Sequence, residues 1–168
     1  YSVLAAACSR APGRWRRALQ LAQEARRAGL QVDAIFCGGA VDACGKGGCW
    51  EGGLGLVEDM QLEALDVGTV TCSAATSGCA KGAAWAAAVE LLDVGRRLLL
   101  EPDAVASGAA VSGCAQGAQW AVAVGLLVGL RKGGPLPNVI TYSSAVTACE
   151  KANCWPEALE LLLLMNTE

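Results

Sequence analysis

The chain has 168 residues, of which 54% are hydrophobic and 17% charged, so it can form a buried core and extensive disorder is disfavoured. It contains no histidine, which excludes histidine-based metal sites and Ser–His or Cys–His nucleophile pairs. The formal net charge of −3 excludes a surface that is basic all over, so nucleic acid could bind only along a local stripe. The longest apolar run, residues 120–130, is shorter than the about 20 residues of a membrane span. We therefore expect a soluble protein.

Two residue types recur along the chain at one fixed spacing. The tryptophans stand at positions 15, 50, 85, 120 and 155, so every interval between them is 35 residues. Cysteines keep the same interval at positions 44, 79, 114 and 149, and Cys8 joins them after a shift of one residue. Such regular spacing predicts an internal repeat, in which each unit is one supersecondary element that stacks on its neighbours.

Each repeat contains two helical patterns in succession. Before each tryptophan, apolar or small residues recur at i, i+3, i+4 and i+7, which predicts a first helix. A second apolar stripe begins at the tryptophan itself and predicts a second helix, with short turns at residues 45–48, 81–84 and 116–119. In chain order the units of this single array over 1–168 are 1–33 with a truncated start, 34–68, 69–103, 104–138, and 139–168 with a truncated end.

The two recurring residue types are expected to pack. Free cysteine behaves as a small hydrophobic residue, and the column cysteines end the apolar stripe of each first helix. The tryptophans are expected to fill the gap between successive repeats, and stacking of these rings on nucleic-acid bases is the less favoured alternative. The cysteines include no CxxC pair, which argues against a four-cysteine zinc site, and we expect neither a metal nor another cofactor.

The last unit carries the residues that point to a family. Residues 138–162 contain Ala-Cys-Glu-Lys, then Trp155 and the pair Ala158-Leu159, and this segment resembles the pentatricopeptide repeat of algal and protist proteins. The tetratricopeptide repeat is the main alternative, but it has a period of about 34 residues and an early tryptophan in its first helix. The resemblance implies an all-α fold, a right-handed α-solenoid of stacked helix–turn–helix repeats.

The resemblance also implies single-stranded RNA as the partner, with about one base read per repeat by two polar side chains. First helices would line the concave surface, and an aliphatic side chain in each would pack against a base. These base-packing positions are Ile35, Val70, Val105 and Ile140. The base-reading positions are Ser2, Gly38, Ser73, Gly108 and Ser143 in first helices, and Asp33, Gly68, Asp103 and Asn138 at repeat ends.

The base-reading positions are unequal along the chain. In the family, serine with aspartate favours guanine, so Ser2 with Asp33 and Ser73 with Asp103 imply guanine in the first and third repeats. The second repeat has glycine at both reading positions, and the fourth has Gly108 with an asparagine. Spacing alone leaves open whether the Val and Ile column consists of ordinary hydrophobic residues at helix starts.

In four of the five repeats, a basic residue stands two positions after the column cysteine. These residues are Arg10, Lys46, Lys81 and Lys151. They could contact the RNA backbone, or they could simply be favoured by the dipole at a helix C-terminus.

The leading hypothesis is therefore an RNA-binding repeat module of an RNA-processing or expression factor in mitochondria or plastids, where the organelle is implied by the family alone. The alternative is a protein-interaction scaffold with little RNA affinity, which the acidic net charge and the glycine reading positions favour. An enzyme is a distant third possibility, because no pair of catalytic residue types recurs.

Overall fold

The computed structural model describes residues 15–28, 33–100, 103–133 and 136–165, and within these ranges all regular secondary structure is helical. A tryptophan opens every second helix, as the repeat spacing predicts. The helices are α2 (Trp15–Arg27), α3 (Ala34–Gly47), α4 (Trp50–Leu62), α5 (Thr69–Lys81), α6 (Trp85–Arg97), α7 (Ala104–Gln116), α8 (Trp120–Gly133), α9 (Val139–Lys151) and α10 (Trp155–Met165).

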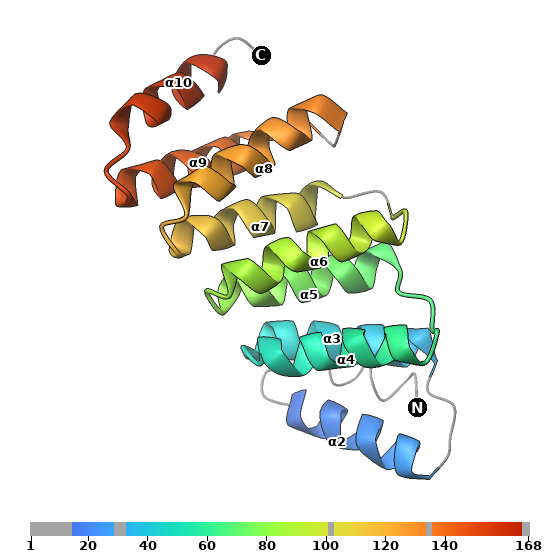
Figure 1. Ribbon diagram of the computed structural model, residues 1–168. Helices are drawn as coiled ribbons and strands as arrows, with labels where there is room; N and C mark the ends of the chain where they lie inside the picture. Colours follow the sequence, from blue (N-terminus) through green and yellow to red (C-terminus); the bar gives the residue numbers. More distant parts are fainter. Residues whose placement is uncertain (1–14, 29–32, 101–102, 134–135, 166–168) are drawn as a thin grey trace.

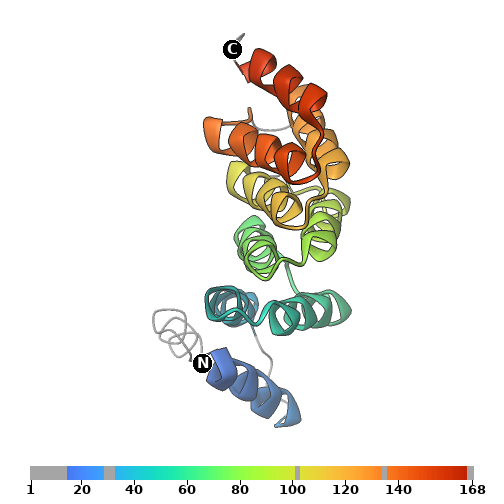
Figure 2. The same ribbon diagram turned by 90° about the vertical axis from the view of Figure 1, so that its left-hand side faces the viewer.

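The helices form two layers of an α-solenoid (Figure 1). Seen at right angles, α3, α5, α7 and α9 form one column, while α4, α6, α8 and α10 form the other (Figure 2). Each first helix packs directly against the next first helix, whereas the described second helices pack chiefly against the first helices on either side. First helices are therefore spaced more closely than second helices. Closer spacing on one side curves the stack, and this places the first helices on its inner surface.

Side-chain caps fix the start of three first helices. Asp33, Asp103 and Asn138 each accept a hydrogen bond from the backbone N–H three residues later, at 2.7, 2.6 and 2.9 Å. These bonds satisfy one of the donors that a helix leaves unpaired at its first turn. Gly68 holds the equivalent place before α5 and offers no side-chain cap. The residues at the repeat ends therefore position the helices that line the inner surface.

The column cysteines lie in the core, as the sequence predicts. Cys44, Cys79, Cys114 and Cys149 are almost completely buried, and all cysteines in the described ranges are free thiols. Burial raises the pKa of Cys44 to about 12 and the pKa values of Cys79 and Cys114 to about 11, because a thiolate would lose its hydration there. These thiols are therefore neutral packing groups at physiological pH.

Three of the tryptophans pack between successive units and are half-buried, whereas Trp155 is 60% exposed. The rings of Trp15 and Trp50 lie over Gly47 and Gly82, so closely that a methyl group at either glycine would overlap the indole. Trp85 lies over Gly117 in the same way. These three rings thus fill the gap between successive repeats, as the sequence predicts, and they remain partly exposed. A glycine at the C-terminal end of the following first helix, or directly after it, makes room for each of the three indoles.

First helices approach one another closely where small residues meet. A methyl group on Gly78 of α5 would lie only 2.7 Å from the Cα of Gly45 in α3. At the next contact, a methyl group on Gly113 of α7 would lie 3.2 Å from the Cα of Ala80. These backbone contacts hold the C-terminal halves of the first helices together and set the spacing of the inner surface.

Candidate nucleic-acid interface

The four predicted base-packing residues form an exposed aliphatic column along the inner surface. Each is the second residue of its first helix, and each keeps between 65% and 82% of its surface in solvent. Residues that stabilise a helix start by packing would be covered by their neighbours, and these side chains are not. These four side chains are therefore not part of the hydrophobic core, and their exposure is compatible with both interpretations that the sequence leaves open. The column consists of Ile35, Val70, Val105 and Ile140.

A groove along α3, α5 and the start of α7 brings several predicted site residues together. We call it the inner groove, and the residues that line it include Val70, Val105, Ser73, Lys46, Lys81 and Asp42. Three kinds of predicted contact, which are base packing, base reading and backbone binding, thus meet in one concavity. These residues come from three helices that are consecutive in the inner layer.

Ser73 and Asp103 form a pair although 30 residues separate them. The Ser73 hydroxyl donates to Asp103 Oδ2 at 2.6 Å, and Asp103 Oδ1 accepts from the backbone N–H of Ala106 at 2.6 Å. One carboxylate therefore caps α7 with one oxygen and holds the serine with the other. The pair places a hydroxyl and a carboxylate next to each other where the end of one repeat meets the start of α7.

The other base-reading positions differ from this pair. Asp33 and Asn138 cap their helices, and the Ser143 hydroxyl donates to the backbone carbonyl of Ile140 at 3.0 Å. Gly38 and Gly108 lie opposite hydroxyl groups of the following first helix, which belong to threonines at positions 71 and 141. Ser2 falls outside the described residues, as does Arg10 of the predicted backbone contacts.

The predicted backbone-binding lysines are also unequal. Lys46 Nζ lies 2.6 Å from Asp42 Oδ2, four residues earlier on the same helix, so its charge is partly neutralised. Lys81 and Lys151 are exposed, and within the described ranges neither has a carboxylate at ion-pair distance. The Asp42 pairing was missed in the sequence, although its i,i+4 spacing is the signal that predicts it. Lys81 is thus the best-placed free cation at the inner groove.

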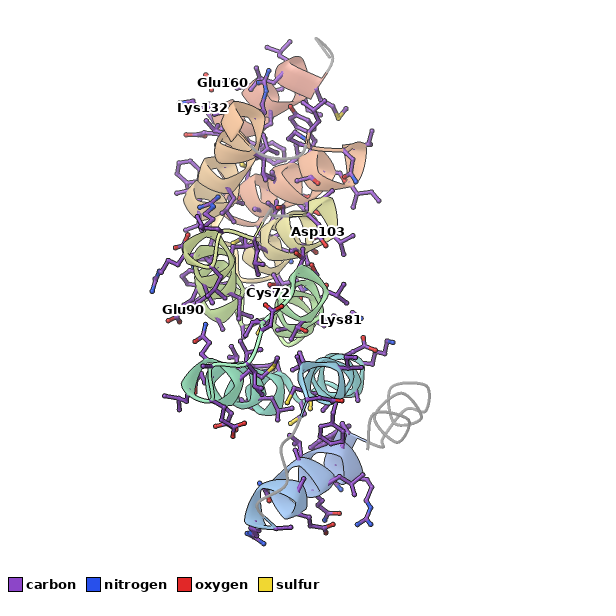
Figure 3. The ribbon with its side chains drawn as sticks, turned by 90° about the vertical axis from the view of Figure 1, so that its right-hand side faces the viewer. Cys72, Lys81, Glu90, Asp103, Lys132 and Glu160 are labelled. Atoms are coloured by element: carbon purple, nitrogen blue, oxygen red, sulfur yellow. The ribbon has the colours of Figure 1, made fainter. Side chains whose placement is uncertain are left out.

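The acidic charge of the chain lies mainly away from the inner layer. Only Asp42 and Glu150 of the 16 acidic residues lie within α3, α5, α7 or α9, while Asp33 and Asp103 cap two of these helices. Figure 3 shows Lys81 on the side of the first helices, whereas Glu90 and Glu160 project from the second helices. The negative net charge therefore describes the outer layer more than the inner groove.

The described residues form neither a metal-binding cluster nor a helix that could span a membrane. Within residues 15–28, 33–100, 103–133 and 136–165, no group of three or more His, Cys, Asp or Glu side chains is placed to hold a metal ion. No helix in the same part of the chain combines the length and the apolar character needed to cross a membrane.

Comparison with known proteins identifies the repeat. The family model described as PPR repeat matches residues 39–63 and 140–168. These two segments of the chain therefore match the pentatricopeptide repeat. The tetratricopeptide alternative is thereby set aside, and no curated protein sequence matches the chain.

Solved pentatricopeptide structures share the fold. The pentatricopeptide repeat protein PPR10 from maize is 24% identical over 99% of this chain, with a TM-score of 0.75, and the chain spans 24% of its length. The pentatricopeptide domain of Arabidopsis thaliana protein-only RNase P 1, solved in complex with tRNA, is 15% identical over 95% of this chain, with a TM-score of 0.79. The chain spans 84% of that domain, but only about a quarter of PPR10.

Proposed function

We propose that the inner groove binds single-stranded RNA, with about one nucleotide at each first helix. The observation that carries the proposal is the exposed column of four Val and Ile side chains, which repeats once per unit at the same helix position. Exposed aliphatic groups in a regular row are costly in water unless a ligand covers them. The faces of unpaired bases are apolar and would cover such a row, whereas paired bases hide their faces in the duplex.

The polar groups beside the column suit base edges and phosphates. A carboxylate accepts hydrogen bonds only, and guanine presents two neighbouring N–H donors on its Watson–Crick edge, so Ser73 with Asp103 suits guanine. Lys81 lines the groove, where it could neutralise a phosphate. The groove thus offers apolar, hydrogen-bonding and cationic contacts at the spacing of one first helix per nucleotide.

Related solved structures support RNA as the ligand. PPR10 has also been solved in complex with an 18-nt psaJ RNA element, and that structure is 17% identical over 95% of this chain, with a TM-score of 0.71. The Arabidopsis domain was solved with tRNA. We extend the proposal to a role in organellar RNA processing or expression, which rests on the resemblance to the pentatricopeptide family alone, and we assign the module no catalytic step of its own.

The proposal is tested by fluorescence anisotropy with a labelled pool of single-stranded RNA. Val70→Asp combined with Val105→Asp places two carboxylates in the groove, and we expect it to weaken binding at least tenfold. The control, Leu62→Asp with Leu99→Asp, changes two aliphatic residues that are at least as exposed and lie at the ends of the second-helix segments. We expect this control to bind like the unmodified protein.

Equal losses in both variants, or no preference for single-stranded RNA over duplex DNA, would contradict RNA binding in the groove. Capture of a protein partner that survives RNase treatment, together with no RNA affinity, would favour the interaction scaffold instead.

A further inference from the structure

The inner surface contains three junctions at which one first helix meets the start of the next. Each junction has three positions, namely the two base-reading positions and the third residue of the following helix. These are Gly38, Gly68 and Thr71 between α3 and α5; Ser73, Asp103 and Ala106 between α5 and α7; and Gly108, Asn138 and Thr141 between α7 and α9. The third position is not one of the predicted reading positions. It is threonine where the first reading position is glycine, and alanine where that position is serine.

The polar groups of the later two junctions are already engaged with one another. Between α5 and α7, Ser73 donates to Asp103 and the third position is the methyl group of Ala106. Between α7 and α9, the Thr141 hydroxyl donates to Asn138 Oδ1 at 2.9 Å. In both junctions the residue at the repeat end therefore organises the hydroxyl beside it.

The junction between α3 and α5 has a different arrangement. Both reading positions are glycine, so the only side-chain polar group among its three positions is the Thr71 hydroxyl. No hydrogen-bond partner for this hydroxyl is found among the described residues, because Gly68 lacks the side chain that Asn138 supplies to Thr141. Thr71 is 7% exposed and the reading residue Ser73 is 8% exposed, so the two side chains are buried to a similar degree.

Glycine at position 38 is linked sterically to this threonine. A methyl group on Gly38 would lie 2.9 Å from Thr71 Oγ1, which is closer than side-chain carbons normally approach. The Thr71 hydroxyl thus occupies the space into which a reading side chain at position 38 would project. At the next junction, the smaller Ala106 follows Ser73 and its partner Asp103.

We propose that Thr71 supplies the polar contact to the RNA base at the junction between α3 and α5, in place of the side chains that Gly38 and Gly68 lack. This inference rests on the proposed binding of RNA in the inner groove. A hydroxyl both donates and accepts hydrogen bonds, so it serves bases with either group and discriminates little among them. The second repeat therefore makes one polar contact to its nucleotide, and this contact selects only weakly among the bases.

The first experiment compares Thr71→Val with Thr71→Ser in binding to single-stranded RNA oligonucleotides. Valine keeps the shape of threonine but removes the hydroxyl, and we expect a two- to tenfold loss of affinity, about the value of one hydrogen bond. Serine keeps the hydroxyl and should retain binding. The matched control is Thr141→Val, which removes the equivalent hydroxyl at the junction between α7 and α9. We expect it to leave the nucleotide contact made by Thr71 unchanged.

The second experiment transplants one junction onto another. Gly38→Ser, Gly68→Asp and Thr71→Ala together recreate the residues of the junction between α5 and α7. Gly68 has φ −75° and ψ 164°, close to the −79° and 160° of Asp103, so aspartate fits its backbone. Selection from a random RNA pool should then enrich the same base at two neighbouring positions. The double variant that retains Thr71 should show a weaker enrichment, because the serine introduced by Gly38→Ser and the threonine compete for one space.

The outcomes separate the two proposals. The role of Thr71 is overturned, and the proposed function is not, if the unmodified protein binds RNA and Thr71→Val has no effect. Equal enrichment by the double and triple variants would overturn it in the same way. Failure of the unmodified protein to bind any single-stranded RNA overturns the proposed function and this inference together. Loss of stability by itself would not shift base enrichment at one position, so the selection distinguishes a specific contact from a folding defect.

Discussion

At the scale of single residues, Asp103 shows how one side chain can serve the fold and the candidate site together. Its Oδ1 caps α7 and its Oδ2 accepts the Ser73 hydroxyl. Aspartate and asparagine are favoured at helix N-caps for purely structural reasons. The presence of such a residue at a repeat end is therefore weak evidence for base reading, and the link to Ser73 is the stronger observation.

The two roles of Asp103 can be separated by substitution. We expect Asp103→Asn to keep an acceptor for the N-cap, leaving stability nearly unchanged while it alters the base selected at the third repeat. Asp103→Ala loses the cap as well, and its free energy of unfolding should fall by about 1 kcal/mol. Urea denaturation and selection from a random RNA pool measure the two effects. Identical base preferences for Asn, Ala and the unmodified residue would contradict base reading by Asp103.

Buried thiols give the stability a pH dependence of known sign. The folded-state pKa values of Cys44, Cys79 and Cys114 are raised to between about 11 and about 12, above the value near 8.5 of an exposed thiol. Above about pH 8.5 the unfolded chain therefore loses thiol protons that the folded chain retains. The stabilisation due to this difference is fully present at lower pH and is lost as the pH rises toward 11 to 12.

We accordingly expect the free energy of unfolding to decline between about pH 8.5 and 12 under reducing conditions. Because tyrosine and lysine titrate in part of this range, Cys79→Ala with Cys114→Ala serves as the control and should show a shallower decline. Denaturation with urea at a series of pH values measures both slopes. An equal slope in the control would contradict the contribution of the buried thiols.

At the scale of helices, two glycines that both lie inside a helix affect stability in opposite ways. Gly78 of α5 faces the backbone of Gly45, so its lack of a side chain permits the close approach of two first helices. Gly125, in the middle of α8, has nothing near the place where a side chain would start. The first glycine is required by packing, whereas the second only lowers the helix propensity of its segment.

The two classes of glycine predict stability changes of opposite sign. Gly78→Ala should lower the free energy of unfolding by about 1–2 kcal/mol, because the strain of overpacking exceeds the gain in helix propensity. Gly125→Ala should raise it by about 0.5–1 kcal/mol. Thermal and urea unfolding of the two variants test this pair directly. Stabilisation by Gly78→Ala would show that the inner helices are not held by this backbone contact.

The sequence predicts the elements well because their signals are local and repeated. The spacing of tryptophan and cysteine placed the start of each second helix and the buried face of each first helix. Contacts between repeats are harder to predict from the sequence, because they join residues about 30 positions apart. Examples are the hydrogen bond from Ser73 to Asp103 and the packing of Trp50 on Gly82. The exposure of Val70 and its equivalents also depends on how neighbouring units stack, which the pattern of one helix does not contain.

At the scale of the whole molecule, the layers separate packing from the proposed binding. The inner layer carries the aliphatic column, the Ser73–Asp103 pair and exposed lysines, while most acidic residues lie in the outer layer and the links. This division reconciles an acidic chain with the proposed binding of RNA, because a bound strand would sense the charges nearest to it. It also predicts that RNA contacts repeat along the solenoid at one site per first helix.

Photocrosslinking of this chain to single-stranded RNA containing 4-thiouridine tests that claim most directly. Mass spectrometry of the crosslinked peptides should locate the RNA at the beginnings of α3, α5, α7 and α9, near Val70, Val105 and their equivalents. Crosslinks confined to α4, α6, α8 and α10 would contradict binding in the inner groove, and so would the absence of crosslinks under conditions in which PPR10 yields them.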